Sequence, residues 1–372
     1  MSPIRVAIIG LSASAKVTWA ADAHLPYLLS PRGRSNYELV ALCNSSKKAA
    51  EAAVKHFNLP ASTKTYGSPE DLAADPDIDL VTVSTRVDVH YDTVKPSIEA
   101  GKAVFVEWPL AENVTRAREL SDLAKARGVK TMVGVQGRVS PVPLKVQEVV
   151  GSGALGNILS SDVRTFHSLL PRKGLPESLS YFADRKVGGN NITIAFAHSE
   201  YKTSTSHSQI QVKNINILSE TNPHTKPTDV PDLLFVGGEL ESAKPYVEPG
   251  ATLSVTFRRD PAPFPGEVAF IWSIYGTKAQ LRVSSPAGIF LNSDSYKLPV
   301  TIEIVEHNGG GKIETVEWQW HEWQESLLLR GRSIAELYDR FASDGVYPTF
   351  EEAVVRHKEI DAYLDSFAAQ SA

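Results

Sequence analysis

Val104-Phe105-Val106-Glu107-Trp108-Pro109 is an apolar run that ends in an acid, an aromatic residue and a proline. Such a run is typical of a parallel β-strand that is buried on both faces and is therefore apolar throughout. Open α/β sheets bind their ligands at the carboxyl edge of these strands. The sequence therefore predicts that Glu107 and Trp108 stand at a ligand-binding edge.

Further strands and helices alternate on both sides of this run. Apolar segments predict strands over 4–9, 37–42, 79–84 and 130–135, and helices are predicted through Ala49, Ala53 and Phe57 and over 91–100 and 114–127. Regular alternation of this kind predicts a doubly wound parallel sheet, a Rossmann fold. We assign this dinucleotide-binding domain to residues 1–140.

The pattern changes in a second domain, which we assign to residues 141–372. A helix over 141–150 precedes strand candidates at 158–165, 210–218, 233–240, 252–258, 268–275, 280–283, 300–305 and 313–318. Their alternating residues predict a large, open, mainly antiparallel sheet with one face covered, so the fold class is α/β plus α+β. Helices follow near 333–341 and 350–367. The spacing within the last one makes His357 a packed residue, and we expect this helix to pack back towards the first domain.

Composition excludes several classes of protein. The 372 residues are 42% apolar and 22% charged, with a net charge of −5, which is typical of a soluble globular protein. No basic cluster supports nucleic-acid binding, and no apolar run is long enough for a membrane span. Met1 leads directly into the first strand, which leaves no room for a signal peptide. The single cysteine, Cys43, forbids an intrachain disulfide and a thiolate metal site, so we expect a cytoplasmic protein without a metal.

The loop after the first strand has part of a dinucleotide-binding pattern. In Gly10-Leu11-Ser12-Ala13-Ser14-Ala15-Lys16 only Gly10 matches G-x-G-x-x-G, because Ser12 and Ala15 occupy the other glycine positions. Small side chains still permit a close approach of the backbone to a pyrophosphate. We therefore predict that Gly10, Ser12, Ser14 and Lys16 bind the cofactor, with an ordinary βα turn as the alternative.

The segment after the second strand favours NADP over NAD. An acid usually binds the ribose of NAD here, but this chain has Asn44-Ser45-Ser46-Lys47-Lys48, whose hydroxyls and lysines suit a 2′-phosphate. Ser45 or Ser46 has the compatible alternative of capping the next helix. Further cofactor contacts are predicted at later strand ends, namely Ser84, Thr85, His90, Glu107, Trp108 and Gln136. His90 has the alternative role of ordering its loop.

Several motifs together resemble one family. They are Gly10-Leu11-Ser12-Ala13, Trp19 with His24, the run from Phe105 to Ala111, Gln136-Gly137-Arg138-Val139-Ser140-Pro141 and the run from Gly153 to Ile158. Over essentially its whole length the chain is similar to the glucose-fructose oxidoreductase, inositol dehydrogenase and rhizopine-catabolism (Gfo/Idh/MocA) family, and within it to the fungal galactose-pathway repressors. The resemblance implies a Rossmann domain followed by an open antiparallel sheet. The repressors are understood to bind a dinucleotide without turning over a substrate.

The chain departs from the family at two catalytic motifs. Where the enzymes carry Glu-Lys-Pro, this chain has Trp108 in place of the lysine, and an indole cannot transfer a proton. The second motif, two glycines leading to Asp and then His, keeps His198 but has Ile194 in place of the Asp. Tyr201 stands where many members have another Asp. His198 is thus either the remaining acid or base, or a structural or ligand-binding residue.

Two functions remain open. The resemblance implies catalytic roles for Glu107, Trp108 and His198 and substrate contacts for Arg138, His198 and Tyr201, although Glu107 and Arg138 have the alternative of a buried salt bridge. The leading interpretation is an NADP-dependent oxidoreductase acting on a hydroxyl or carbonyl of a sugar-like or cyclic small molecule. The other is a non-catalytic NADP-binding regulator with a protein partner. In both cases the apolar stretch 268–272 predicts a homodimer or dimer of dimers through the open sheet.

Overall fold

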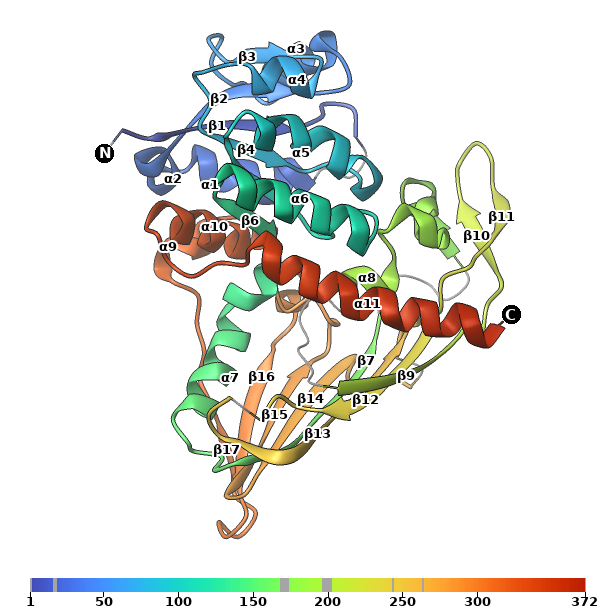
Figure 1. The fold of residues 1–372 in the computed structure, drawn as a ribbon. Coiled ribbons are helices and arrows are strands. Elements are labelled where there is room, and N and C mark those ends of the chain that lie inside the picture. Colours follow the sequence, from blue (N-terminus) through green and yellow to red (C-terminus); the bar gives the residue numbers. More distant parts are fainter. Residues whose placement is uncertain are drawn as a thin grey trace. The chain divides into compact units, whose positions relative to one another are not determined.

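The computed structural model describes residues 2–15, 19–167, 174–195, 203–242, 244–262 and 264–371 (Figure 1). The chain divides into two compact units. The first consists of Met1–Gln136, Lys186–Gly189 and His321–Lys358, and the second of Gly137–Arg185, Asn190–Trp320 and Glu359–Ala372. Among the described residues, no helix has the length and apolar character needed to cross a membrane.

The first unit contains a sheet of six parallel strands in the order β3-β2-β1-β4-β5-β6. This arrangement confirms the predicted doubly wound sheet. The strands are β1 (Ile4–Ile9), β2 (Tyr37–Cys43), β3 (Lys64–Tyr66), β4 (Leu80–Val83), β5 (Ala103–Glu107) and β6 (Thr131–Gly134). The strand order reverses between β1 and β4, and ligands of such sheets bind at this reversal.

The helices of the first unit follow the predicted pattern, with additions. They are the π-helix η1 (Ala20–His24), α1 (Leu25–Leu29), α2 (Pro31–Asn36), α3 (Lys47–His56), α4 (Pro69–Ala73), η2 (Val87–Val89), α5 (His90–Glu99), α6 (Val114–Arg127), α9 (Glu322–Glu325) and α10 (Leu329–Ala342). Local sequence sets their ends: Asn113 caps α6 by accepting the N–H of Arg116 at 3.0 Å, and Gly128 ends it with a φ of 65°. Residues 350–358 of α11 (Phe350–Ser371) also belong to this unit.

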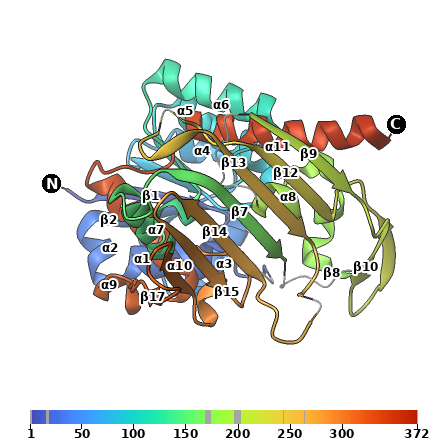
Figure 2. The same cartoon turned by 90° about the horizontal axis from the view of Figure 1, so that it is seen from below.

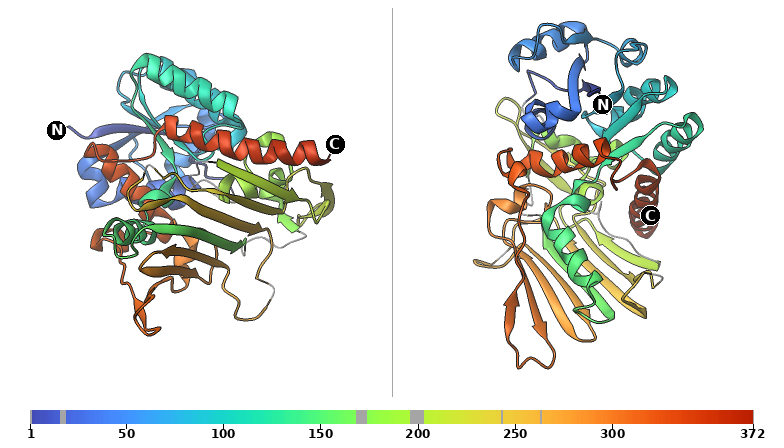
Figure 3. Two further views of the ribbon diagram at one scale, coloured as in Figure 1. Left: turned by 60° about the horizontal axis from the view of Figure 1, so that its bottom comes forward. Right: turned by 90° about the vertical axis from the view of Figure 1, so that its left-hand side faces the viewer.

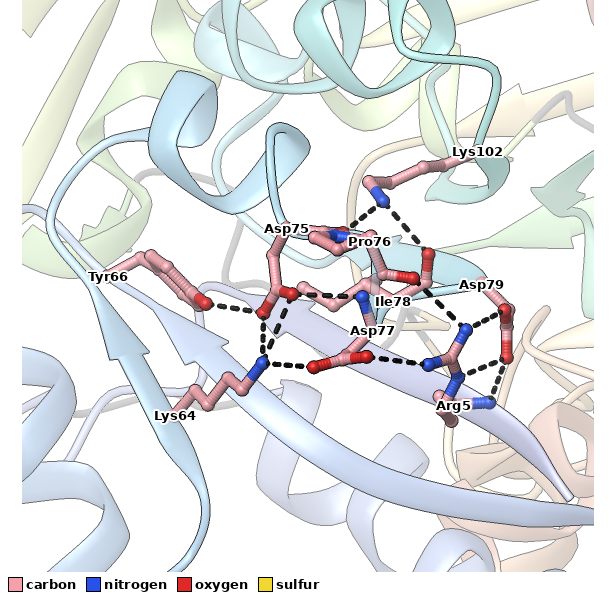
Figure 4. A network of polar contacts seen from close by, with 9 residues as sticks. All are labelled: Arg5, Lys64, Tyr66, Asp75, Pro76, Asp77, Ile78, Asp79 and Lys102. Carbon is pink, nitrogen blue, oxygen red and sulfur yellow. Dashed lines mark hydrogen bonds and ion pairs between the residues drawn. The ribbon is translucent and has the colours of Figure 1, made fainter.

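Hydrogen bonds and ion pairs connect β3 to the residues around the amino ends of β1 and β4 (Figure 4). Asp75, which is 8% exposed, accepts hydrogen bonds from Lys64 Nζ at 2.8 Å, from the Tyr66 hydroxyl at 2.5 Å and from the Asp77 N–H at 2.9 Å. Burial opposes ionisation of Asp75, but these hydrogen bonds outweigh it and lower its pKa to about 2. The other members drawn are Arg5, Pro76, Ile78, Asp79 and Lys102.

The second unit contains an eight-stranded sheet in the order β17-β16-β15-β14-β7-β13-β12-β9. Its neighbours are antiparallel except β7 and β13, which are parallel. The strands are β7 (Ile158–Phe166), β9 (Thr203–Gln209), β12 (Leu233–Glu239), β13 (Val247–Arg258), β14 (Phe270–Gly276), β15 (Ala279–Ser285), β16 (Thr301–Glu306) and β17 (Ile313–Thr315). The predicted large, mainly antiparallel sheet is confirmed.

A smaller sheet and several short helices complete the second unit. The three strands β8 (Gly174–Pro176), β10 (Asn214–Leu218) and β11 (His224–Pro227) pair in the order β11-β10-β8. The helices are α7 (Pro141–Gly151), η4 (Glu177–Ala183), α8 (Asn191–Ala195) and η6 (Asp294–Lys297), while η3 (Gln136–Val139) and η5 (Arg185–Val187) lie where the units join in sequence. The strand predicted over 210–218 is wrong at its start, because pairing begins at Asn214. The edge strand β9 just before it was not predicted, since its residues are polar.

The two faces of the eight-stranded sheet differ. Helix α7 lies along one face (Figure 3), where Val142 and Val146 pack in one apolar cluster with Ile274 and Leu281. In Figure 2 the other face of β13, β7 and β14 is seen with no helix in front of it. The sheet is therefore open on one side, as the alternating sequence predicts.

The two sides of β14 carry different side chains. Phe270 and Ile274 are buried in the apolar cluster and Trp272 packs against it, so these three side chains point to the covered side. Ile271, Ser273 and Tyr275 alternate with them on the open side. Within the apolar stretch 268–272, strand alternation therefore turns Phe270 and Trp272 inward and leaves Ile271 on the open face.

Candidate functional site

The loop after β1 approaches the end of β4 very closely. Gly10 has a φ of 106°, and a Cβ at this position would lie 2.3 Å from the carbonyl oxygen of Ser84, so the approach requires glycine. The N–H of Ser14 donates to Ser12 Oγ at 3.2 Å, and neither serine is buried. This short loop lies at the reversal of strand order, where a pyrophosphate would bind. Lys16 lies outside the described residues.

Asn44 connects this loop to the end of β2. Its Nδ2 donates to the carbonyl oxygen of Leu11 at 2.9 Å. Ser46 Oγ accepts the N–H of Ala49 at 3.2 Å, so Ser46 caps α3, as one of its two predicted roles requires. Ser45, Lys47 and Lys48 are exposed beside it. The end of β2 therefore presents hydroxyls and ammonium groups to solvent, without a carboxylate at positions 44–48.

His90 connects the loops that follow β4 and β5. Its Nδ1 lies 2.9 Å from the carbonyl oxygen of Pro109, and its Nε2 lies 3.0 Å from that of Thr85. Burial is the largest influence on the ring and lowers the pKa of His90. The ring lies between the carbonyl oxygens of these two loops and the side chain is 1% exposed, so His90 is placed to order the loops, which is one of the two roles that the sequence left open. Ser84 and Thr85 are half-buried at the same edge.

Glu107 ends β5, and its carboxylate is held from two sides. Oε1 lies 2.9 Å from Nε2 of His24. On the other side, a Cβ at Gly134, the β6 residue paired with Glu107, would lie 2.5 Å from Oε2. The carboxylate thus lies directly over the β6 backbone, and the side chain is 11% exposed. Glycine at position 134 provides the space it occupies.

His24 continues the contact into the core. The ring is fully buried, and its Nδ1 lies 2.9 Å from the hydroxyl of Tyr338 on α10. That hydroxyl also lies 2.9 Å from Thr82 Oγ1 on β4. His24 is one of the residues that carry the family resemblance, but no sequence pattern indicates that it, Tyr338 and Thr82 contact one another beside Glu107. His24 lies on the π-helix η1, a feature that is common at functional sites and becomes visible only in the structure.

Trp108 lies against a buried histidine. Its ring centroid is 4.7 Å from that of His357, which is 3% exposed. Burial, followed by the neighbouring His90, lowers the pKa of His357 to about 3, so the ring is neutral at physiological pH. Its helical spacing predicted this packed position. Trp108 itself is half-buried, so part of the indole remains available at the edge.

The remaining residues assigned to the site are spread over both units. Gln136 is buried just after β6 in the first unit. Arg138 is exposed and belongs to the second unit. In the described part of the chain, no group of three His, Cys, Asp or Glu side chains is placed to hold a metal ion.

The second family motif is described only in part. Asn190 begins α8, because its Oδ1 accepts the N–H groups of Ile192 at 2.9 Å and Thr193 at 3.1 Å. Ile194, at the position where the family resemblance implies an Asp, packs against an apolar cluster of the second unit. His198 and Tyr201 lie outside the described residues.

Comparison with known proteins identifies the family. Residues 4–135 match the oxidoreductase family with an NAD-binding Rossmann fold, and residues 141–285 match the Gal80p C-terminal domain. Dehydrogenase aclE of Aspergillus oryzae is 32% identical over 98% of this chain and 96% of its own length. The chain belongs to the Gfo/Idh/MocA oxidoreductase family. The resemblance inferred from the sequence motifs is thereby confirmed.

Regulators as well as dehydrogenases are among the relatives of this Gfo/Idh/MocA protein. The galactose/lactose metabolism regulatory protein GAL80 of Saccharomyces cerevisiae is 27% identical over 98% of this chain and 93% of its own length. A super-repressor mutant of Gal80p from the same yeast superimposes with a TM-score of 0.84 at 22% identity, covering 99% of this chain and 97% of that one. The structural likeness shows a shared fold. Membership of the family therefore leaves turnover and regulation as separate possibilities.

Proposed function

We propose that the protein is an NADP-dependent oxidoreductase that transfers a hydride to or from a hydroxyl or carbonyl of a sugar-like or cyclic small molecule. The observation that carries this proposal is the edge formed by the ends of β1 and β2. There, a glycine with positive φ lets the backbone approach a pyrophosphate, and the exposed Ser45, Lys47 and Lys48 suit a 2′-phosphate. The residues present thus fit a phosphorylated dinucleotide.

The protein's own contribution to the reaction is the transfer of a proton. When bound, the dinucleotide would accept or supply the hydride. Of the residues assigned to catalysis, Glu107 and His198 have side chains that can exchange a proton with a substrate hydroxyl or carbonyl. Trp108 shapes the pocket by stacking, because its indole donates one hydrogen bond but exchanges no proton.

Calorimetric titration with both dinucleotides tests the cofactor. We expect NADP(H) to bind at least about tenfold more tightly than NAD(H), or about 1.4 kcal/mol, because positions 44–48 lack a carboxylate. The variant K47A/K48A should weaken NADP(H) binding but leave NAD(H) binding nearly unchanged. K55A, which removes an exposed lysine from the same helix, is the matched control. Equal affinities of the wild type for the two dinucleotides would exclude the preference for NADP.

A second function is favoured by the two replaced catalytic positions. Trp108 and Ile194 both make apolar or aromatic contacts where family enzymes carry a lysine and an aspartate. These replacements support an NADP-binding regulator that turns over no substrate. Oxidation of NADPH in the presence of sugars, quinones and carbonyl compounds separates the two functions. Turnover supports the oxidoreductase, whereas tight NADP binding with no turnover on the whole panel supports the regulator.

A further inference from the structure

We propose that the site binds the oxidised nicotinamide dinucleotide in preference to the reduced one, because Glu107 presents a negative charge that is paired with no lysine or arginine among the described residues. This preference rests on the dinucleotide binding proposed above and adds the redox state of the bound form. Among the described residues, the ionisable group in contact with Glu107 is His24. The lysine that the family carries next to this glutamate is replaced by Trp108, which has no charge.

The topology of the sheet places Glu107 beside the nicotinamide half of the ligand. A dinucleotide lies across the crevice where the strand order reverses, here between β1 and β4. The loop after β1 and the exposed segment after β2 serve the phosphates and the adenosine. The nicotinamide half therefore extends over β4 and β5. Glu107 ends β5, and its carboxylate lies over Gly134 of β6.

One arrangement of the hydrogen bonds around His24 leaves the negative charge on Glu107. Burial raises the pKa of Tyr338, so its hydroxyl keeps its proton. If that hydroxyl donates to Nδ1 of His24, the ring donates from Nε2 to Oε1 of Glu107, and the hydroxyl of Thr82 donates to Tyr338. Each of these polar groups then has a hydrogen-bond partner, the imidazole is neutral and the carboxylate carries one negative charge. Oε2 accepts no hydrogen bond from the described residues.

A carboxylate in this position discriminates between the two redox states by charge. The oxidised nicotinamide ring is a cation, whereas the reduced ring is neutral. A neighbouring carboxylate that is largely shielded from water attracts the cation more strongly than bulk water would allow. We expect oxidised NADP to bind at least about tenfold more tightly than NADPH. If the protein is an enzyme, this preference favours the complex that can oxidise a substrate. If it is a regulator, the preference makes it respond to oxidised NADP.

The test is the ratio of the dissociation constants of NADPH and oxidised NADP, measured by calorimetry on the full chain. Glu107→Gln keeps the size of the side chain and removes its charge, so the ratio should fall at least about fivefold. Trp108→Lys restores a cation next to the carboxylate and should lower the ratio in the same direction. Glu119→Gln, which removes an exposed charge from α6, is the matched control and should leave the ratio unchanged.

A third variant tests whether the effect depends on where the Glu107 charge lies, because it moves the carboxylate without removing it. In Gly134→Ala the new methyl group would lie 2.5 Å from Oε2, so the carboxylate must move while its charge remains, and the ratio should take an intermediate value. A wild-type ratio within about twofold of one, or the same ratio in wild type, Glu107→Gln and Trp108→Lys, overturns the inference even when both forms bind. If the folded wild type binds neither form, the proposed function fails and the inference fails with it.

Discussion

Trp108 is the single residue whose substitution tests most directly whether this protein catalyses hydride transfer. Its indole supplies contact area instead of a charge, and Ile194 packs against apolar side chains at the position where the family resemblance implies an aspartate. We expect Trp108→Ala to weaken NADP(H) or substrate binding about threefold to tenfold, through loss of aromatic contact. Trp108→Lys alone should not raise turnover, because Ile194 still replaces the second ionisable group. Steady-state assays and calorimetry check both expectations.

The double variant Trp108→Lys with Ile194→Asp separates the two functions. If the wild type turns over substrate, the double change should abolish turnover, because the active site has evolved away from the family arrangement. If the wild type is inactive, restored ionisable groups should produce measurable hydride transfer. Ile194→Asp alone is the control for the cost of placing a carboxylate against an apolar cluster, which should appear as a lower melting temperature.

Asp75 stabilises the packing of the loop before β4 against β3, because its carboxylate accepts hydrogen bonds from Lys64 and Tyr66 of that strand. Its pKa is lowered from 3.8 to about 2 in the folded protein, so its contribution is fully present above about pH 4 and is lost as the pH falls through 2. We expect Asp75→Asn to lower the free energy of unfolding by about 1–2 kcal/mol at pH 7. Urea unfolding between pH 7 and pH 3 should show this difference shrinking towards the acid end.

Asp77→Asn is the matched control for that network. Asp77 also contacts Lys64 Nζ at 2.8 Å, but its side chain is 59% exposed. A solvated ion pair contributes little, so we expect a loss below about 1 kcal/mol. Equal losses for the two variants would show that burial of Asp75 is not the source of the stability.

The whole molecule is expected to form a homodimer or dimer of dimers through the open face of the eight-stranded sheet. Hydroxyl and charged side chains share that face with exposed aromatic residues such as Phe235 and Tyr275. A mixed surface of this kind suits a non-obligate interface, so light scattering at micromolar concentration should show the dimer dissociating on dilution. Phe235→Asp should yield monomers. Val346→Asp, at an 84% exposed position of the first unit, should not, and a monomeric wild type would contradict the prediction.

Local pattern was enough to predict most of the architecture. The apolar run 104–106 could only be a strand buried on both faces, and all three residues are fully buried in β5. The predicted helix over 114–127 agrees with α6, whose ends are set by the adjacent residues Asn113 and Gly128. The family motifs likewise lie in short contiguous stretches. Sequence therefore determined the two kinds of sheet, the helices between the parallel strands and the acid-free segment after β2.

Tertiary structure alone decided which residues surround Glu107 at the end of β5. Glu107, His24, Tyr338 and Thr82 come from four segments that are far apart in the chain, and no periodicity relates them. The same holds for the parallel pairing of β7 with β13 and for the side of the sheet towards which Phe270 turns. Periodicity and capping report interactions between near neighbours in sequence. The partner of a buried carboxylate, and the direction a strand faces, depend instead on how distant segments pack together.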